Sequence, residues 1–224
     1  MTAGLLPRAR PHNRAGRLVA ALLVLAGLAA GWWAVHQAMP AWYARLWYPL
    51  EHETAIRQNA DRHDLDPALV AGVIHAESGW VPDSRSGAGA VGLMQVLPET
   101  ARFIASRPDR PSPSPERLEE PEVNIAYGTW YLRYLVDRHG SVDVALAAYN
   151  AGEGVVRGWE TRARAQGRAF RVPEDVPFAE TRAFVRRVRD LAPVYRRAYG
   201  DELGPAVPGL ARVSSDRPAA APAP

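Results

Sequence analysis

Residues 66–80, DPALVAGVIHAESGW, carry the clearest helix signals in this chain. Asp66 can accept hydrogen bonds from the free N–H groups at a helix start, and Pro67 has the φ angle that suits the first helical position. Gly79 is the residue type that most often follows the end of a helix. The sequence therefore predicts a helix that begins at Pro67 and ends at about Ser78.

Glu77 falls on the apolar side of this predicted helix. It follows Val70, Val73 and Ile74 at the spacings that place side chains on one helix face. Withdrawal of a carboxyl group from water raises its pKa above the reference of about 4.3, and the negative end of the helix dipole acts in the same direction. Glu77 is therefore a candidate proton donor near neutral pH. The plainer alternative is a carboxylate that reaches water past the last helical turn.

Apolar residues keep a helical spacing through most of the segment 51–199. Further helices are predicted over about 98–105, 123–138, 141–149 and 180–199, the last with a kink at Pro193. Strand signals are weak, so we expect a mainly α fold with at most a small β element between Pro82 and Gly92.

The composition is that of a chain that folds. Its 224 residues leave room for one ordinary domain, with 47% hydrophobic and 23% charged residues. The net charge is only +3, so nucleic-acid binding is not expected. The absence of cysteine excludes disulfides, zinc–thiolate sites, thiol catalysis and an N-terminal lipid-modified cysteine.

Residues 18–35 form an uncharged and almost wholly apolar run, which comes after a basic segment, residues 1–17. The run is longer than the core of a cleavable signal peptide and lacks a good cleavage site, so we expect a retained transmembrane anchor; the alternative is a cleaved signal peptide. The positive-inside rule then places residues 1–17 in the cytoplasm and the chain beyond the span outside. The basic residues that set this orientation are Arg8, Arg10, Arg14 and Arg17.

The remaining boundaries are set by composition. Residues 36–50 mix aromatic residues with Pro40 and Pro49, and form a connector that either packs on the domain or rests at the membrane interface. Residues 51–200 are the expected folded domain. Residues 201–224, rich in Pro, Ala and Ser, are expected to form a flexible tail.

A second candidate stretch is SGAGAVGLMQVLPETA, residues 86–101. Its glycines permit backbone conformations that bring main-chain groups close to a ligand. It is not a phosphate-binding loop, because it lacks the lysine and the strand-to-helix setting of those motifs. Met94 and Gln95 come after the glycines; alternatively, they are simply a core and a surface residue.

A third candidate stretch is ALAAYNAGEGVV, residues 145–156. Tyr149 and Asn150 are expected at a helix end, and Gly152 and Gly154 are expected to terminate that helix. An aromatic ring beside an amide suits a sugar ring. The alternative is a plain helix end with a buried tyrosine.

In order along the chain, five motifs resemble the soluble-type lytic transglycosylase family, which is related to goose-type lysozyme. They are YPLEHETAIRQNADRHDLDPALVAGVIHAESGW, GAVGLMQVLPETA, NIAYGTWYLRYL, AYNAG and ETRAFV. The resemblance covers about residues 48–199. Family members often carry tyrosine where this chain has Phe184, and no role is assigned to Tyr127.

The resemblance implies a lysozyme-like α+β fold, mainly helical, with a glycan-binding cleft. It implies that Glu77 is catalytic and that Tyr149 and Asn150 lie by the scissile bond. It further implies that the cleft is lined by Ser86, Met94 and Gln95, and that Glu180 helps to shape a sugar subsite.

The implied reaction needs one carboxyl group and neither a metal nor an organic cofactor. Glu77 would protonate the oxygen that links N-acetylmuramic acid to N-acetylglucosamine, and would then take the proton of the muramyl carbon-six hydroxyl, which gives a 1,6-anhydro product. Ordinary glycosidases need two carboxyl groups. Asp83 and Glu99 have no helical phase that places them beside Glu77, although folding could bring either close.

Two other functions are compatible with the sequence: a hydrolytic muramidase on the same fold, and a catalytically silent peptidoglycan-binding scaffold module. The expected partners are the glycan strands of peptidoglycan and, through residues 18–35, the inner membrane. The domain is expected to face the periplasm or the wall.

Overall fold

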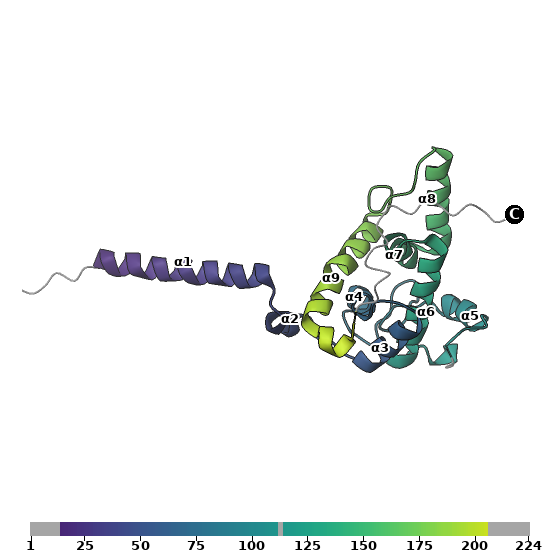
Figure 1. Cartoon of the computed structure of the whole chain (residues 1–224), viewed down its shortest axis with the longest axis horizontal. Helices are drawn as coiled ribbons and strands as arrows, with labels where there is room; N and C mark the ends of the chain where they lie inside the picture. The colour runs from purple at the N-terminus through teal and green to yellow at the C-terminus, as the bar shows by residue number, and fades with distance from the viewer. Residues whose placement is uncertain (1–13, 112–113, 206–224) are drawn as a thin grey trace, which may run out of the picture.

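The computed structural model describes residues 14–111 and 114–205, and these are mainly helical (Figure 1). Two isolated β-bridges, Arg85 to Val91 and Val91 to Val96, are consistent with the small β element that was predicted. The prediction of a mainly α fold is therefore confirmed. The helices are α1 (Arg14–Ala38), α2 (Ala41–Trp47), α3 (Glu53–Arg62), α4 (Pro67–Ser78), α5 (Pro98–Ala105), the short 3₁₀ helix η1 (Pro115–Arg117), α6 (Pro121–His139), α7 (Val142–Ala151), α8 (Glu153–Ala165) and α9 (Ala179–Leu203).

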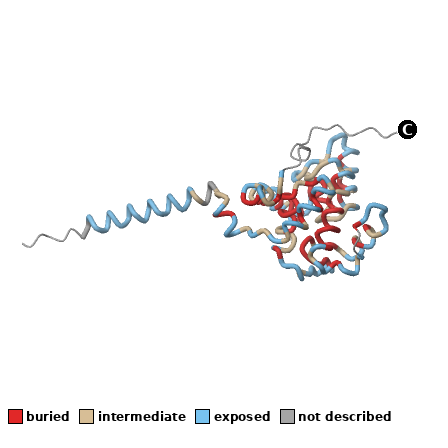
Figure 2. The backbone as a smooth tube through the Cα atoms, turned by 60° about the horizontal axis from the view of Figure 1, so that its bottom comes forward, coloured by how far each residue is buried: buried red, intermediate tan, exposed pale blue. Residues whose placement is uncertain are grey.

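Helix α1 projects away from the packed body of the molecule (Figure 1). Its segment Gly16–Val35 has 20 residues, a mean hydropathy of 2.2 and no buried residue, and the exposed surface is visible along its length in Figure 2. This length and composition suffice to cross a membrane, although a signal sequence near the N-terminus would have the same properties. The predicted span 18–35 lies inside this segment.

Helix α4 is the central helix, and its ends lie where the sequence predicts them. The side chain of Asp66 accepts a hydrogen bond from the N–H of Ala68 at 2.8 Å, and Gly79 adopts a left-handed φ of 59° after the last turn. Between them residues 67–74 are all buried. A Cβ on Gly72 would lie 3.3 Å from the backbone of α9, so the two helices pack closely there.

The last helix differs from its prediction in two respects. The break in helical geometry lies at Tyr199, where φ is −134° and ψ is 27°, and Pro193 is accommodated inside the helix. The helix then continues to Leu203, which is fully buried. Residues 201–203 therefore belong to the folded body, which corrects the predicted start of the tail at residue 201. The rest of that tail from residue 206, and residues 1–13, lie outside the described residues.

Three α-helices of the packed body, α2, α3 and α8, were not among the predicted ones. Gly152, with φ of 93°, ends α7 as predicted. No loop follows it, because α8 begins at the next residue. The connector 36–50 contains α2, whose residues Tyr43 and Ala44 are buried and which packs against α9. The connector was predicted either to pack on the domain or to rest at the membrane interface. The face of α2 that carries Tyr43 and Ala44 packs on the domain.

Candidate active site

Glu77 lies in the last turn of α4 and is only partly exposed. Within residues 14–111 and 114–205 no hydrogen bond is made to its carboxyl group. Burial raises the pKa of Glu77 from 4.5 to about 8, the charge of Arg187 acts to lower it, and the charge of Glu180 raises it further. The group is therefore mainly protonated at neutral pH, and so it can donate a proton.

The start of α9 brings the second predicted carboxyl group, Glu180, into the electrostatic surroundings of Glu77. Glu180 is exposed in the first turn of this helix. Two turns further on, Arg187 donates a hydrogen bond to the carbonyl of Ala76 at 3.4 Å, which places a guanidinium group at the end of α4. The charges that shift the pKa of Glu77 thus come from α9 and not from Asp83 or Glu99.

Tyr149 and Asn150 lie at the end of α7. Their side chains connect this helix to the glycine-rich loop and to the start of α9. The hydroxyl of Tyr149 donates to the carbonyl of Met94 at 2.7 Å. Burial first, and then the nearby charge of Glu77, raise the pKa of Tyr149 well above 10, so its hydroxyl stays neutral. The side-chain amide oxygen of Asn150 accepts a hydrogen bond from the hydroxyl of Thr181 at 2.8 Å, which joins α7 to the first turn of α9.

The predicted cleft-lining residues of the glycine-rich loop behave differently from one another. Met94 is fully buried, and its sulfur would lie 2.5 Å from a Cβ on Gly128. Its side chain therefore fills the core beside α6 and cannot line a cleft, which corrects the prediction for this residue. Gln95 is half-buried and donates from its amide to the carbonyls of Ser84 and Gly92 at 3.0 and 2.9 Å. Ser86 is exposed, with its hydroxyl oxygen accepting from the N–H of Ala90 at 3.0 Å.

One residue that the sequence did not single out organises this loop. Asn124, in the first turn of α6, is fully buried. The oxygen of its side-chain amide accepts from the N–H of Met94 at 2.7 Å. The nitrogen of the same side-chain amide donates to the carbonyls of Val91 and Leu118 at 2.8 and 2.9 Å. Asn124 therefore fixes the main chain of Met94, and through it the hydrogen bond to Tyr149. The only sequence signal is a polar residue in the otherwise apolar start of NIAYGTWYLRYL.

Tyr131 of α6 is a second residue without a predicted role. Its ring lies 5.6 Å from the ring of Tyr149, centroid to centroid, and stacks at 6.1 Å on the ring of Tyr134. Burial raises the pKa of Tyr131 to about 12, so this side chain is neutral as well. Aromatic rings thus continue outward from Tyr149 along α6. Among the described residues no group of three or more His, Cys, Asp or Glu side chains could hold a metal ion.

Solved structures of larger proteins contain the same arrangement of helices. The chain aligns with the 70 kDa soluble lytic transglycosylase from Escherichia coli with a TM-score of 0.61 and 33% identity, over 72% of this chain and 26% of that one. It aligns with an inactive glutamate-to-glutamine mutant of the lytic transglycosylase Slt from Pseudomonas aeruginosa with a TM-score of 0.61 and 30% identity, over 77% of this chain and 28% of that one. The fold is therefore the lysozyme-like helical fold of these catalytic domains.

Residues 54–170 match the model of the family described as Transglycosylase SLT domain. This chain belongs to that family, as the five motifs predicted. It is also 34% identical over 157 residues to the soluble lytic murein transglycosylase of Escherichia coli strain K12, a match that covers 69% of this chain and 24% of the relative. The chain thus spans about a quarter of the length of that relative.

Proposed function

We propose that this chain is a peptidoglycan lytic transglycosylase that cleaves the β-1,4 bond between N-acetylmuramic acid and N-acetylglucosamine. The observation that carries the proposal is the state of Glu77, an acid with a pKa of about 8 and no hydrogen-bond partner in the described ranges. Such a group holds a proton at neutral pH and can take it back once the leaving group has departed. Relatives named as lytic murein transglycosylases support the assignment.

Glu77 performs both proton transfers in this mechanism. It first donates its proton to the glycosidic oxygen, while the N-acetyl oxygen of the muramyl residue stabilises the developing cation. The ionised carboxylate then removes the proton of the carbon-six hydroxyl, whose oxygen attacks carbon one and closes the 1,6-anhydro ring. A pKa near the working pH suits a group that must act in both directions. Lysozyme relies on the same effect, because an apolar pocket raises the pKa of its acid.

The exposed and half-exposed polar residues among the predicted site residues are the proposed sugar contacts. They are Ser86, Gln95, Asn150 and Glu180. The charge of Glu77 acts on Tyr149, whose hydroxyl bonds to the carbonyl of Met94 and whose ring contacts the ring of Tyr131. We assign Tyr149 to the position beside the scissile bond, with its ring as the platform for a sugar.

The experiment that tests the reaction is a digestion of purified peptidoglycan with the full chain in detergent, with mass analysis of the fragments. The proposal predicts anhydromuramic ends, which are lighter by one water than hydrolytic ends. Fragments with only reducing muramic ends would contradict it. No fragments at all, together with retained binding of glycan strands, would favour a silent binding module.

A hydrolytic muramidase is the second candidate, and one observation favours it. The charge of Glu180 acts on Glu77, and a second carboxylate near the acid could activate a water molecule. Glu180→Gln separates the two mechanisms. A transglycosylase with Glu180 in a sugar subsite would keep its anhydro products, whereas a muramidase that uses Glu180 as its base would lose cleavage altogether.

We further propose that residues 18–35 are a retained single-pass anchor and that the domain from residue 51 faces the wall. The apolar α1 supports this placement. So does the name of a relative from Glaesserella parasuis, a membrane-bound lytic murein transglycosylase C that is 35% identical over 123 residues, 50% of this chain and 32% of that one. External protease should digest the domain in spheroplasts. A mature protein that starts between Ala29 and Ala38 and is released without detergent would refute the anchor.

A further inference from the structure

The outer face of α2 is apolar and uncovered. Trp42, Leu46 and Trp47 are 61%, 71% and 62% exposed. Removal of large apolar side chains from water is favourable, so three such residues on two turns of one helix form a surface that favours binding to another apolar surface. Scattered exposed apolar residues are ordinary, but contiguous ones mark an interaction site. We call this surface the outer face of α2.

The opposite side of α2 is fixed to the domain. The guanidinium of Arg45 donates to the carbonyl of Ala198 at 2.8 Å, pairs with Glu202 at 2.6 Å, and lies 4.7 Å above the ring of Tyr199. Arg45 is the charged residue of this helix. Because its charge is turned toward α9 and paired there, it does not interrupt the outer face.

The chain immediately after α2 is held as well. Tyr199 donates from its hydroxyl to the carbonyl of Tyr48 at 3.0 Å, and Tyr195 donates to the carbonyl of Pro49 at 3.2 Å. These bonds and those of Arg45 attach the inner side of α2 and the residues just after it to the last turns of α9. Any surface that binds the outer face therefore also sets the orientation of the domain.

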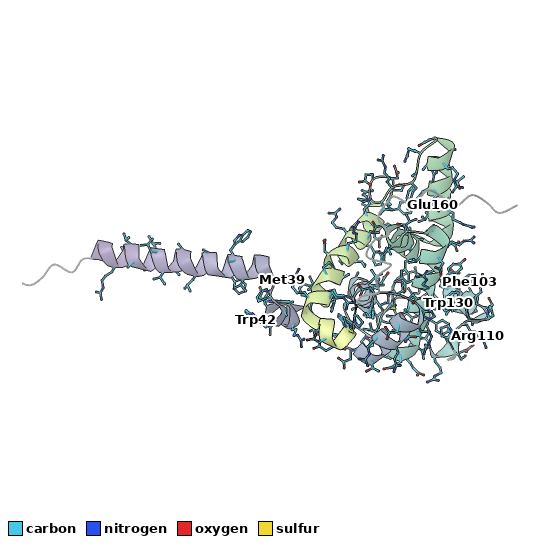
Figure 3. All side chains as sticks on the ribbon, in the orientation of Figure 1. Met39, Trp42, Phe103, Arg110, Trp130 and Glu160 are labelled. Atoms are coloured by element: carbon cyan, nitrogen blue, oxygen red, sulfur yellow. The ribbon has the colours of Figure 1, made fainter. Side chains whose placement is uncertain are left out.

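The outer face is continuous with α1. The ring of Trp32 in α1 lies 5.9 Å from the ring of Tyr43, edge to face. Between the two helices lies a cavity of about 550 Å³ in which every lining residue is apolar or aromatic. Met39 and Trp42, labelled in Figure 3, mark the bend where the chain leaves α1 and enters α2. The lining includes Leu28, Trp32 and Val35 of α1, and Trp42, Leu46 and Trp47 of α2.

We propose that α2 lies in the interface of the bilayer that α1 crosses, with Trp42, Leu46 and Trp47 at the boundary between headgroups and acyl chains. This inference rests on the proposed anchoring by α1. Three observations select a lipid surface as the occupant: direct continuity with an apolar helix of spanning length, an outer face without charge, and tryptophan, the residue type enriched at membrane interfaces. With 7 residues, α2 is far too short to cross the bilayer itself.

The consequence is a fixed orientation of the domain. α2 holds the C-terminal end of α9, whereas Glu180 and Arg187 of the candidate site lie in its N-terminal half. Between Glu180 and Ala198 the helix rises by roughly 27 Å, at about 1.5 Å per residue. The docked end and the candidate site are therefore separated along α9.

Single cysteines can test this surface, because the chain has none of its own. Trp42→Cys, Leu46→Cys and Trp47→Cys would each be labelled with an environment-sensitive fluorophore, in the full chain reconstituted into phosphatidylcholine and phosphatidylglycerol vesicles. Lipids with a spin label near the top of the acyl chain serve as the quencher. Leu25→Cys in α1 reports on the anchor, and Arg164→Cys, an exposed position on α8, is the matched control.

We expect fluorescence at the three α2 positions to fall by about half or more with the quencher lipid, since interfacial helices bury their apolar face about 5–10 Å deep. The Arg164→Cys label should be unaffected. Quenching at Leu25→Cys without quenching at α2 would overturn the inference and leave the anchor standing. Absence of quenching at Leu25→Cys would overturn both. Disulfide-linked dimers of the Trp47→Cys protein without lipid quenching would assign the face to a second copy of the chain and overturn it too.

Discussion

Asn124 and Glu77 are both polar side chains on helices of the packed body, yet their surroundings are opposite. Asn124 at the start of α6 is fully buried and makes three hydrogen bonds to main-chain groups. Glu77 at the end of α4 has none from the described part of the chain, and its pKa is raised to about 8. The buried amide that stabilises the fold has its hydrogen-bonding groups paired. The largely buried acid has no such partner among the described residues, which costs stability but leaves its proton available for chemistry.

The largest effect is expected from Glu77→Gln. Glutamine keeps the shape of the side chain but cannot donate and recover a proton, so we expect glycan cleavage to fall by at least about 10²-fold with an unchanged circular dichroism spectrum. Glu99→Gln, at an exposed position on α5, is the matched control and should cleave normally. A Gln variant with more than roughly a tenth of normal activity would remove Glu77 from the catalytic role.

Asn124→Ala tests how much the buried, hydrogen-bonded amide of Asn124 stabilises the fold. It leaves the N–H of Met94 and the carbonyls of Val91 and Leu118 without a partner, so we expect a loss of about 2–4 kcal/mol in the free energy of unfolding. Asn59→Ala should cost less, since Asn59 bonds only within α3. Chemical denaturation measures both. Equal losses would mean that Asn124 is no more than an ordinary buried amide.

The raised pKa also predicts how stability depends on pH. The folded-state pKa of Glu77, about 8, lies above its ordinary value of 4.5, so between these values the folded protein binds more protons than the unfolded one. Stability conferred by the protonated group is therefore lost as the pH rises through this window. Because Glu77→Gln cannot titrate at this position, it does not lose this stability as the pH rises. The difference in the free energy of unfolding between the variant and the native chain should therefore change by about 1–3 kcal/mol in favour of the variant from pH 4.5 to pH 9, after allowance for partial exposure. Parallel pH dependences in thermal unfolding would contradict this.

A smaller effect is expected when Arg187 is neutralised. Its charge lowers the pKa of Glu77, so Arg187→Gln should move the alkaline limb of kcat/KM to higher pH, because Glu77 must be protonated to act as the acid. Arg186→Gln, the exposed neighbour, is the control and should leave the limb in place. A shift to lower pH, or the same shift in both variants, would show that Arg187 does not act on Glu77 directly.

Local signals were enough to predict the helix that carries Glu77. The Asp66 cap, Pro67 and Gly79 lie in one stretch and define both ends of α4, and the helical phase of Glu77 places it toward the packed side. The same kind of signal failed at Gly152, which ends α7 but does not prevent α8 from starting at the next residue. A glycine stops one helix without determining whether another begins directly after it.

The rest of the site depends on contacts between distant segments. The role of Asn124 exists only because folding brings residues 91, 94 and 118 around it. Met94 was expected in the cleft, but Gly128 of α6 leaves space that its side chain fills, so it is buried. Sequence pattern carries no information on which of two neighbouring residues, Met94 or Gln95, turns inward in an irregular loop.

A titration of Glu77 shows whether this acid holds a proton at neutral pH. The full chain in detergent, labelled with ¹³C at the glutamate side-chain carboxyl carbons, would be compared with labelled Glu77→Gln by NMR to assign the resonance of Glu77. We predict a titration midpoint near pH 8, the value that burial gives to this carboxyl group. A midpoint near the ordinary value of 4.5 would contradict it, because Glu77 would then be ionised at neutral pH and would not hold the proton that cleavage requires.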